Sequence, residues 1–371
     1  MKKRIRLFAG LAVLAAAGML NWSGIQGQAA AAESAETLAG RIAVSEPATL
    51  GDDAVTVTKI SISAVGDCTL GNDPAQESRG NAFHKVYNAN GPDYFLQYCR
   101  PVFYTDDITI ANLEGVLTTM GTAQQKAWRF RSDPSYIEIL THSSVDVVAF
   151  ANNHCRDFGE ISYTDTMKNL EAYGLPYSSE DNVCVMEVNG VRVGIASLKL
   201  LGDNAGYFKQ RIQTKVDELK AENVQLILLN CHWGIELDRV PNHVQTELGH
   251  FAIDAGVDLV IGHHPHVLQS VECYNGKYII YSLGNFCFGG NTNPKNKDTM
   301  IWRQDFIFTN GQLSASEARV LPYSISSRKD LNDYCPVPLN GADYDRVIRQ
   351  LNDLSAAYHV QFDEKGNVVP Q

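Results

Sequence analysis

Short apolar runs rich in valine and isoleucine alternate with segments of helical character from residue 56 onward. Such runs have the length and residue types of buried β-strands. Residues 162–174 and 241–256, which lie between runs, are predicted to be helices because each ends at a glycine and the second begins at a proline. This alternation predicts an α/β fold. The predicted strands are residues 57–65, 107–111, 145–151, 191–198, 224–230, 257–262 and 277–283.

The N-terminus has the pattern of an export signal. Lys2, Lys3, Arg4 and Arg6 precede or border an apolar stretch at 7–20, and small residues suited to a signal peptidase follow at 28–34. We predict a signal peptide at 1–32, a polar linker at 33–55, and an extracellular or cell-surface location. The apolar stretch is shorter than the ~20 residues that span a bilayer comfortably, although an uncleaved signal would anchor the protein.

The composition limits the possible partners. A chain of 371 residues with 44% hydrophobic residues can bury a large core, as one large domain or two smaller ones. Its formal net charge is −11, and loss of the basic leader would make it more negative. Such a surface repels nucleic acid and anionic lipid.

Polar residues follow five of the predicted strands. Ligands in open α/β sheets collect beyond the carboxyl ends of the strands, so these side chains are expected to meet in one cleft. Each residue alone also has a structural explanation, such as a turn, a loop cap or a buried histidine. The residues expected in the cleft are Asp67, Glu114, Asn153, His154, Asp157, His232, His264 and His266.

The segment "GHHPH" at 262–266 is the most specific of these motifs, because three close histidines at a strand end have no obvious packing purpose. His264 and His266 form a His-x-His pair that one loop can direct together. His263 is then expected to orient the other ligands.

Carboxylate, amide and imidazole donors together suit a borderline divalent ion such as Mn, Zn, Fe or Ni, whereas calcium prefers oxygen alone. One or two ions could share these ligands, with Glu114 as a bridge between two. His154, next to the ligand candidate Asn153, could protonate a leaving group.

Eight cysteines in an exported protein would ordinarily suggest disulfides. Four of them, Cys68, Cys155, Cys231 and Cys287, lie beside candidate site residues, and the spacings form no compact framework. We therefore expect mostly free, buried thiols.

Seven motifs, in this order, resemble those of the poly-γ-glutamate capsule biosynthesis (CapA) family, which is related to the calcineurin-like metallophosphoesterases. They are "VGDCTLG", "ANLEG", "FRSDP", "ANNHCRDFG", "CHWGIE", "VIGHHPHVLQ" and "YSLGNFCFG". The resemblance covers roughly residues 58–340. It implies a metallophosphoesterase-like sandwich of two central β-sheets flanked by helices at 56–340, and a role in synthesis or export of an anionic γ-linked glutamate polymer. It also implies a phosphorylated precursor as an alternative ligand and membrane-embedded capsule synthesis machinery as a partner.

Carried over residue by residue, the family pattern places the six metal ligands at Asp67, Glu114, Asn153, His232, His264 and His266, with the catalytic histidine at His154. Asp157, in the same motif as His154, is also expected to act in catalysis. The related phosphoesterases typically open with Asp-x-His, whereas Cys68 and Thr69 follow Asp67 here. One ion would thereby lose an imidazole. Occupancy of both metal positions, and activity as a metal-dependent hydrolase, therefore stay open. The alternatives are a general extracellular metallophosphoesterase and a noncatalytic surface assembly subunit.

Four more residues are candidates for substrate contacts. The guanidinium of Arg131 could bind a phosphate or carboxylate in a bidentate manner and act in catalysis, or it could pair with Asp133 at the surface. Trp233 and Glu236 could line or close the cleft, and Asn285 could reach it.

The C-terminal residues 341–371 are predicted to form a helix and tail that pack on the domain. Tyr344, Val347, Leu351 and Leu354 would share one face of that helix.

Overall fold

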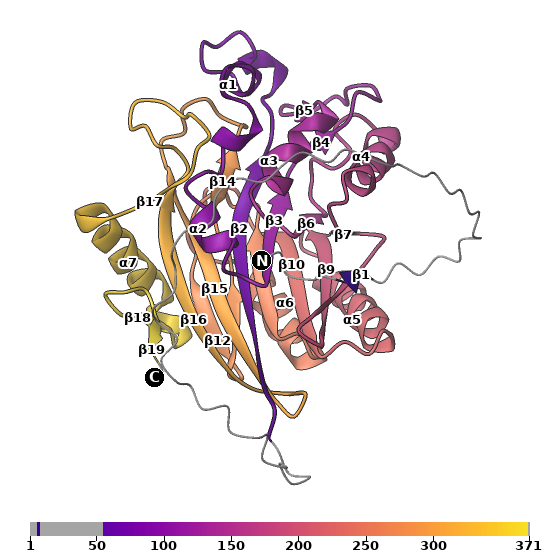
Figure 1. The fold of residues 1–371 in the computed structure, drawn as a ribbon, viewed down its shortest axis with the longest axis vertical. Coiled ribbons are helices and arrows are strands. Elements are labelled where there is room, and N and C mark those ends of the chain that lie inside the picture. Colours follow the sequence, from indigo (N-terminus) through magenta and orange to yellow (C-terminus); the bar gives the residue numbers. More distant parts are fainter. Residues whose placement is uncertain (1–5, 8–54, 370–371) are drawn as a thin grey trace, which may run out of the picture.

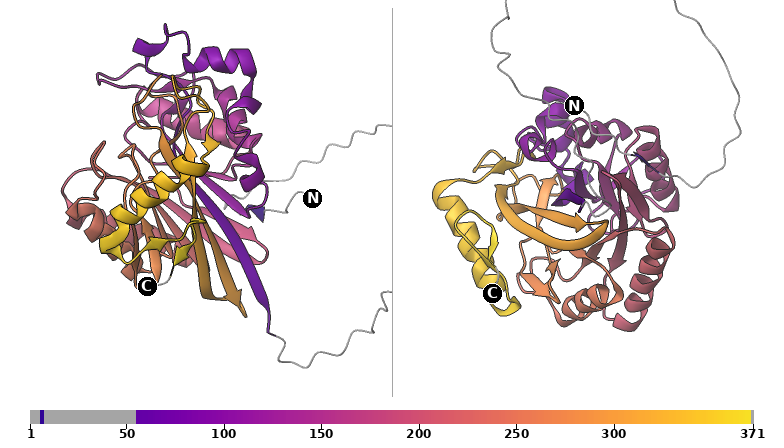
Figure 2. Two further views of the ribbon diagram at one scale, coloured as in Figure 1. Left: turned by 90° about the vertical axis from the view of Figure 1, so that its left-hand side faces the viewer. Right: turned by 60° about the horizontal axis from the view of Figure 1, so that its bottom comes forward.

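Two β-sheets lie face to face, with helices on their outer faces (Figure 1; Figure 2). The structure is a computed structural model that describes residues 6–7 and 55–369. It confirms the predicted α/β fold of two sheets flanked by helices. The predicted signal peptide and linker lie outside the described residues, apart from residues 6–7 and residue 55. No helix within the described ranges combines the length and apolar character needed to cross a bilayer.

Sheet A has a parallel centre, in which β9, β10, β11 and β13 run in the same direction. In spatial order its strands are β1 (Arg6–Leu7), β8 (Cys184–Val188), β9 (Val191–Leu200), β10 (Leu226–Trp233), β11 (Leu259–His263), β13 (Lys277–Ile280) and β12 (Val271–Tyr274).

Sheet B is mixed: β2, β3, β6 and β7 are parallel, and β15 and β16 form a long antiparallel hairpin. A further strand, β14 (Asn285–Phe288), pairs with the C-terminal end of β2. In spatial order the strands are β17 (Val337–Pro338), β16 (Gln312–Ser324), β15 (Asp298–Thr309), β2 (Val57–Thr69), β3 (Ile108–Leu113), β6 (Val147–Phe150) and β7 (Tyr177–Ser179).

The α-helices cover the two outer faces and one edge of the sandwich (Figure 2). They are α1 (Phe83–Asn90), α2 (Arg100–Phe103), α3 (Ile137–Thr141), α4 (Glu160–Ala172), α5 (Ala205–Ala221), α6 (His243–Ala255) and α7 (Gly341–Ser355). The 3-10 turns are η1 (Pro74–Gln76), η2 (Pro92–Tyr94), η3 (Pro134–Tyr136) and η4 (Ala356–Tyr358). Two short strand pairs lie outside the two large sheets: β4 (Val116–Leu117) with β5 (Arg131–Ser132), and β18 (Gln361–Phe362) with β19 (Val368–Val369).

The central core lies between the two sheets. On β2, Ile60, Ile62 and Ala64 point into it, and on β10 Leu226 and Leu228 meet them from the other sheet. The alternate residues of both strands point outward, under the helices. Each large aliphatic side chain buried in this way contributes roughly 1.5–3 kcal/mol. This burial fixes the two sheets against each other.

Helix α7 closes an edge of the sandwich. Its residues Val347, Ile348 and Leu351 are buried in the central core. The Ser270 hydroxyl donates to the Leu354 carbonyl at 2.7 Å, and the Val271 N–H donates to Ser355 Oγ at 2.9 Å. The C-terminal helix therefore belongs to the folded body, beside β12 and β16.

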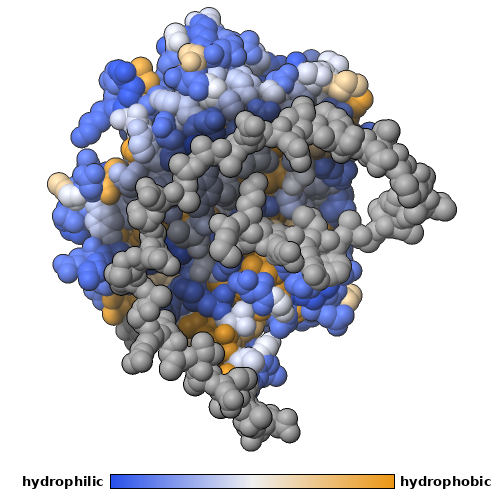
Figure 3. Space-filling model, in the orientation of Figure 1, coloured by the Kyte–Doolittle hydropathy of each residue, from blue (hydrophilic) through white to orange (hydrophobic). Residues whose placement is uncertain are grey.

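The visible surface is mostly polar. Hydrophilic side chains cover most of the described surface that is visible in Figure 3.

Some elements were missed by the sequence patterns. Helix α5 has Phe208, Ile212, Val216 and Leu219 on its buried side, a helical spacing that was readable in the sequence. The β15–β16 hairpin was also not predicted, although buried and more exposed residues alternate along part of both strands, a pattern typical of half-buried strands. Its strands, of 12 and 13 residues, are longer than the usual 3–10.

Candidate metal centre

The strand-end residues singled out in the sequence lie at one end of the sandwich, where the parallel strands of both sheets finish. Asp67 belongs to β2 and His232 to β10. Glu114 directly follows β3, Asn153 follows β6, and His264 and His266 follow β11. A chain of contacts described below connects all six.

Asp67 joins the two sheets. Its Oδ2 atom lies 3.1 Å from His266 Nδ1 and 3.4 Å from the backbone nitrogen of His264, which come from sheet A. Its Oδ1 atom accepts a hydrogen bond from the Asn112 amide at 2.7 Å. His263 Nδ1 lies 3.6 Å from Oδ1, and His263 Nε2 lies 3.3 Å from Asn230 Oδ1. This agrees with an orienting role for His263.

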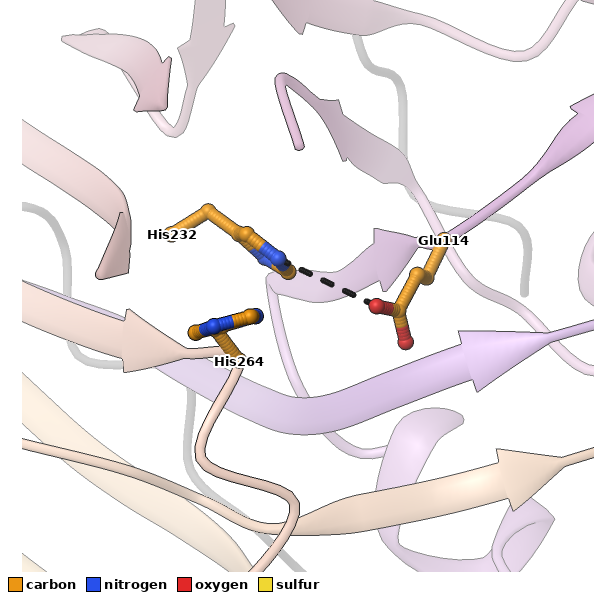
Figure 4. A group of neighbouring side chains, drawn as sticks. All are labelled: Glu114, His232 and His264. Carbon is orange, nitrogen blue, oxygen red and sulfur yellow. Dashed lines mark ion pairs between the residues drawn. The ribbon is translucent and has the colours of Figure 1, made fainter. Parts of the chain in front are cut away.

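Glu114 lies at the centre of the group and is fully buried. Its Oε1 atom is 3.8 Å from His232 Nε2, 3.8 Å from His266 Nε2 and 4.0 Å from His154 Nε2. Figure 4 shows Glu114 and His232 pointing toward each other, with His264 beside them. The other oxygen, Oε2, accepts a hydrogen bond from Thr69 at 3.2 Å. Thr69, two residues after Asp67, therefore supports the Glu114 carboxylate.

His232 connects Asn153 with the histidine turn. Its Nε2 atom lies 2.8 Å from the amide oxygen of Asn153, and its ring centroid lies 4.7 Å from that of His264. Asn153 itself is half-buried.

The "GHHPH" segment forms a turn in a strained backbone conformation. His264 has φ 97° and His266 has φ 58°, on either side of Pro265. Positive φ is uncommon for residues other than glycine and costs roughly 1–3 kcal/mol where it persists. The turn brings both imidazoles close to Glu114, with their ring centroids 5.8 Å apart.

The donor set fits a divalent ion. Three groups each have ligand atoms within 4.8 Å of one another: Asp67, Glu114 and His266; Glu114, His232 and His264; and Glu236, His264 and His266. Glu114 Oε1, His232 Nδ1 and His264 Nδ1 are buried without a hydrogen-bond partner. Unpaired buried polar atoms are costly, and coordination to an ion would satisfy them. The mixture of carboxylate and imidazole favours borderline ions such as Mn, Zn or Fe over calcium.

Burial and neighbouring charges set the protonation of these groups. Burial lowers the pKa of His264 to about 4 and holds that of His232 well below its usual value, so both are neutral imidazoles at neutral pH. Burial raises the pKa of Glu114 to about 7. Burial alone would lower the pKa of His266, but the Glu114 and Asp67 carboxylates raise it to about 10. Burial opposes ionisation of Asp67, yet hydrogen bonds from His263 and His266 hold its pKa well below the usual range.

A hydrogen-bond network holds His154 in a fixed orientation. His154 Nδ1 lies 2.7 Å from Asp157 Oδ2, and the same oxygen accepts the Phe130 N–H at 2.7 Å. Lys126 donates to Asp157 Oδ1 at 2.6 Å and to the Asn153 carbonyl at 3.0 Å. His154 Nε2 is then free to face Glu114. Asp157 is fully buried, so it is a positioning residue for His154.

Sequence reasoning missed three supporting residues. Asn112 and Thr69 lie in the same strand-end motifs as Glu114 and Asp67, so the motifs themselves contained the signal. Lys126 lies in a loop of no regular secondary structure, and nothing in the sequence pattern marked it.

The structure corrects the prediction for Trp233. This side chain is buried beneath α6, where its Nε1 donates to the Tyr281 carbonyl at 2.9 Å. His232 faces the cleft, and successive residues of a strand point to opposite faces, so Trp233 faces away.

The other substrate-binding candidates have different surroundings. The Arg131 guanidinium lies over the Phe158 ring, 4.0 Å from its centroid, and donates to the Gly121 carbonyl at 3.3 Å. These two contacts of Arg131 involve neither a metal-ligand candidate nor Asp133. Asn285 Oδ1 lies 2.8 Å from His266 Nδ1, and the Asn285 Nδ2 donates to the His266 backbone carbonyl at 3.3 Å, so Asn285 holds both the imidazole and the backbone of His266.

All eight cysteines are free in the described structure, as the sequence predicted. Burial raises the pKa of the Cys68 thiol, next to Asp67, to about 12. Such thiols are protonated and packed within the protein, so they are poor metal ligands and nucleophiles.

The fold and the donor set define an α/β sandwich protein with a cluster of carboxylate and imidazole groups that could hold a divalent metal ion. A model of the family described as bacterial capsule synthesis protein PGA_cap matches residues 61–290. The chain therefore belongs to this family, which confirms the resemblance found in the sequence.

Named relatives agree with this assignment. The PGA biosynthesis protein CapA of Bacillus subtilis is 31% identical over 273 residues, which cover 67% of this chain and 67% of the relative. The capsule biosynthesis protein CapA of Bacillus anthracis is 29% identical over 320 residues, which cover 79% of this chain and 73% of the relative. A probable polyglutamine synthesis accessory protein of Mycobacterium tuberculosis is 27% identical over 208 residues, 48% of this chain and 55% of that protein.

Among solved structures, the purple acid phosphatase PPD1 from yellow lupin seeds aligns with a TM-score of 0.29 and 10% identity. The alignment covers 70% of this chain and 53% of the phosphatase. A similarity of this size does not by itself establish a common fold.

Proposed function

We propose that this protein is exported and acts at the cell surface in the synthesis or export of poly-γ-glutamate. Its metal cleft would handle the γ-linked polymer or a phosphorylated precursor. Membership of the capsule synthesis family supports the role in capsule formation. One observation supports a metal-dependent function most directly. Glu114 Oε1 is buried without a hydrogen-bond partner, and it lies within 4.0 Å of a nitrogen of each of three imidazoles.

The charge of the chain supports a metal-dependent mode of binding. With a formal charge of −11, the protein as a whole repels an anionic polymer. A divalent ion in the cleft would supply local positive charge for a carboxylate or phosphate. The same overall charge disfavours nucleic acid as a ligand. The proposed partner is membrane-embedded capsule synthesis machinery.

A second candidate function is hydrolysis of phosphate esters. The arrangement of His154, Asp157 and Lys126 favours it, because it holds an imidazole nitrogen toward the cleft as a proton donor. A bound divalent ion would supply Lewis acidity and a nucleophilic hydroxide. The residues of this chain would bind the ion, hold His154 and transfer the proton from its Nε2 atom.

Elemental analysis of protein purified without chelator tests the metal cleft. We expect about one or two equivalents of Mn, Zn or Fe. Capsule output should fall when His264→Ala replaces the wild type in a producing cell. A protein free of metal, with normal capsule output from the variant, would exclude a metal-dependent role and favour a noncatalytic assembly subunit.

A panel of phosphatase and phosphodiesterase substrates, assayed with added Mn, Zn and Fe, separates the two candidates. Turnover of a generic nitrophenyl phosphate would favour the second. Metal binding and loss of capsule without any phosphoesterase turnover would favour the first.

A further inference from the structure

Glu236 is an exposed carboxylate beside the histidine turn. It lies in the loop after β10, and it makes no hydrogen bond or ion pair with any residue in the described ranges. One of its oxygens nevertheless lies within 4.8 Å of a ring nitrogen of His264 and of His266. The carboxylate therefore faces two imidazoles without being paired to either.

Two hydrogen bonds hold this loop against the histidine turn. The Leu237 N–H donates to the Pro265 carbonyl at 2.8 Å. The Gln269 side chain donates to the Asp238 carbonyl at 2.8 Å. Leu237 and Asp238 directly follow Glu236 in the chain. Their hydrogen bonds therefore fix the Glu236 backbone relative to the histidine turn.

Leu237 has an unfavourable backbone conformation. Its φ is 66°, which is rare for a leucine, and its side chain is 71% exposed, so little packing compensates for the strain. Strained residues of this kind persist where the surrounding structure imposes them, and they cluster at ligand-binding sites. Here the strain occurs next to the residue that faces the imidazoles.

His264, one of these two histidines, also has an unpaired ring atom. His264 is only 6% exposed, and its Nδ1 atom is buried without a hydrogen bond. An unpaired buried donor or acceptor costs roughly 1–3 kcal/mol. A cation bound to His264 would give this ring a partner, and a Glu236 oxygen lies close enough to a ring nitrogen of His264 and of His266 to share the ion.

We propose that Glu236 is a metal ligand that occupies the solvent side of an ion held by His264 and His266 and is displaced by an anionic substrate. This inference rests on the proposed metal cleft. It changes the expected role of Glu236 from a substrate contact to a competitor of the substrate. A carboxylate on an exposed loop is suited to this exchange, because a phosphate or carboxylate of the ligand offers the same donor atoms.

The test compares Glu236→Gln with Asp238→Asn. Each variant removes one negative charge from the same loop, but only the first removes the carboxylate that faces the imidazoles. Cobalt(II) is the probe, because its visible absorption reports the number and type of ligands. We expect Glu236→Gln to weaken cobalt binding by about tenfold or more and to change the spectrum. Asp238→Asn should change the affinity by less than about twofold, because exposed charges are screened by water and salt.

Inorganic phosphate, titrated into the cobalt-loaded proteins, tests the exchange. Glu236→Gln should bind phosphate several-fold more tightly than Asp238→Asn does, because the competing carboxylate is absent. Equal cobalt affinity in the two variants overturns the proposal, whatever the phosphate result. If the wild type binds cobalt and the variants do not differ, only the role of Glu236 fails. If the wild type binds no divalent ion, the proposed metal cleft fails with it.

Discussion

His154 is held by Asp157 through a 2.7 Å contact between imidazole Nδ1 and carboxylate Oδ2, which leaves His154 Nε2 facing Glu114 at 4.0 Å. The preceding residue, Asn153, contacts His232 instead. Two adjacent residues of one motif therefore have different surroundings. Asn153 lies with the metal-ligand candidates, whereas His154 is held by Asp157 with its Nε2 atom toward Glu114.

The first prediction separates these roles. If the cleft is catalytic, His154→Ala should leave bound metal nearly unchanged and lower turnover by ~10² to 10⁴, the usual contribution of a positioned proton donor. His264→Ala should lose metal, and its activity should partly recover as metal concentration is raised. Metal content and turnover of both variants, measured across added Mn and Zn, provide the check. Equal metal loss in the two would identify His154 as a ligand.

The second prediction concerns Lys126. Its Nζ atom lies 2.6 Å from Asp157, which is fully buried, and Lys209 makes a pair of the same length with the exposed Glu247. Lys126→Ala should lower the free energy of unfolding by about 1–3 kcal/mol, because it removes a partner from a buried charge. Lys209→Ala should cost less than about 1 kcal/mol. Urea denaturation measures both, and equal losses would contradict the prediction.

The third prediction concerns metal-linked stability. Glu114 contributes to two of the three metal-ligand groups, so Glu114→Gln should abolish most metal binding. At a free metal concentration of 100 times Kd, binding stabilises a protein by about 2.7 kcal/mol. Added metal should therefore raise the melting temperature of the wild type and of the control Glu364→Gln, an exposed residue outside the cleft. A similar rise in Glu114→Gln would show that the ion binds elsewhere.

The fourth prediction concerns the close approach of two backbone segments behind Asp67. A Cβ atom at Gly66 would lie 1.9 Å from the Gly284 carbonyl oxygen, which accepts the Asp67 N–H at 3.0 Å. Gly66→Ala should destabilise the protein by about 1–3 kcal/mol or more and weaken metal binding, because Asp67 must move. The control is Gly80→Ala, where nothing lies within 4 Å of the added atom. Calorimetry and metal titration should separate the two variants.

The fifth prediction concerns acid stability away from the cleft. Burial opposes ionisation of Asp305, but hydrogen bonds from Lys59 and Ser61 hold its pKa below the usual value of 3.8. A lowered folded pKa gives stability that is present above pH 3.8 and lost as the pH falls through the folded pKa. The stability lost between neutral pH and that acid range should therefore be smaller in Asp305→Asn than in the wild type. Denaturation at both pH values would refute this if the two losses were equal.

The sequence was sufficient to place the elements that carry the cleft. Strand runs and their polar ends depend on local residue order, and residues 257–262, predicted as a strand, overlap β11. Because ligands bind beyond the carboxyl ends of parallel strands, the polar residues at these ends could be predicted to lie close together. The same alternation of side chains along a strand could have excluded Trp233, since it follows His232 on β10.

The tertiary structure decided which of these groups touch and what supports them. Asp67 meets His266 only because β2 and β11, in different sheets, are packed together by the central core. Lys126 reaches Asp157 from a loop with no periodic pattern. The positions of Glu236 and His264 depend on the positive φ values of Leu237 and of His264 itself. Leucine and histidine do not by themselves favour positive φ. Contacts between segments distant in the chain impose this conformation.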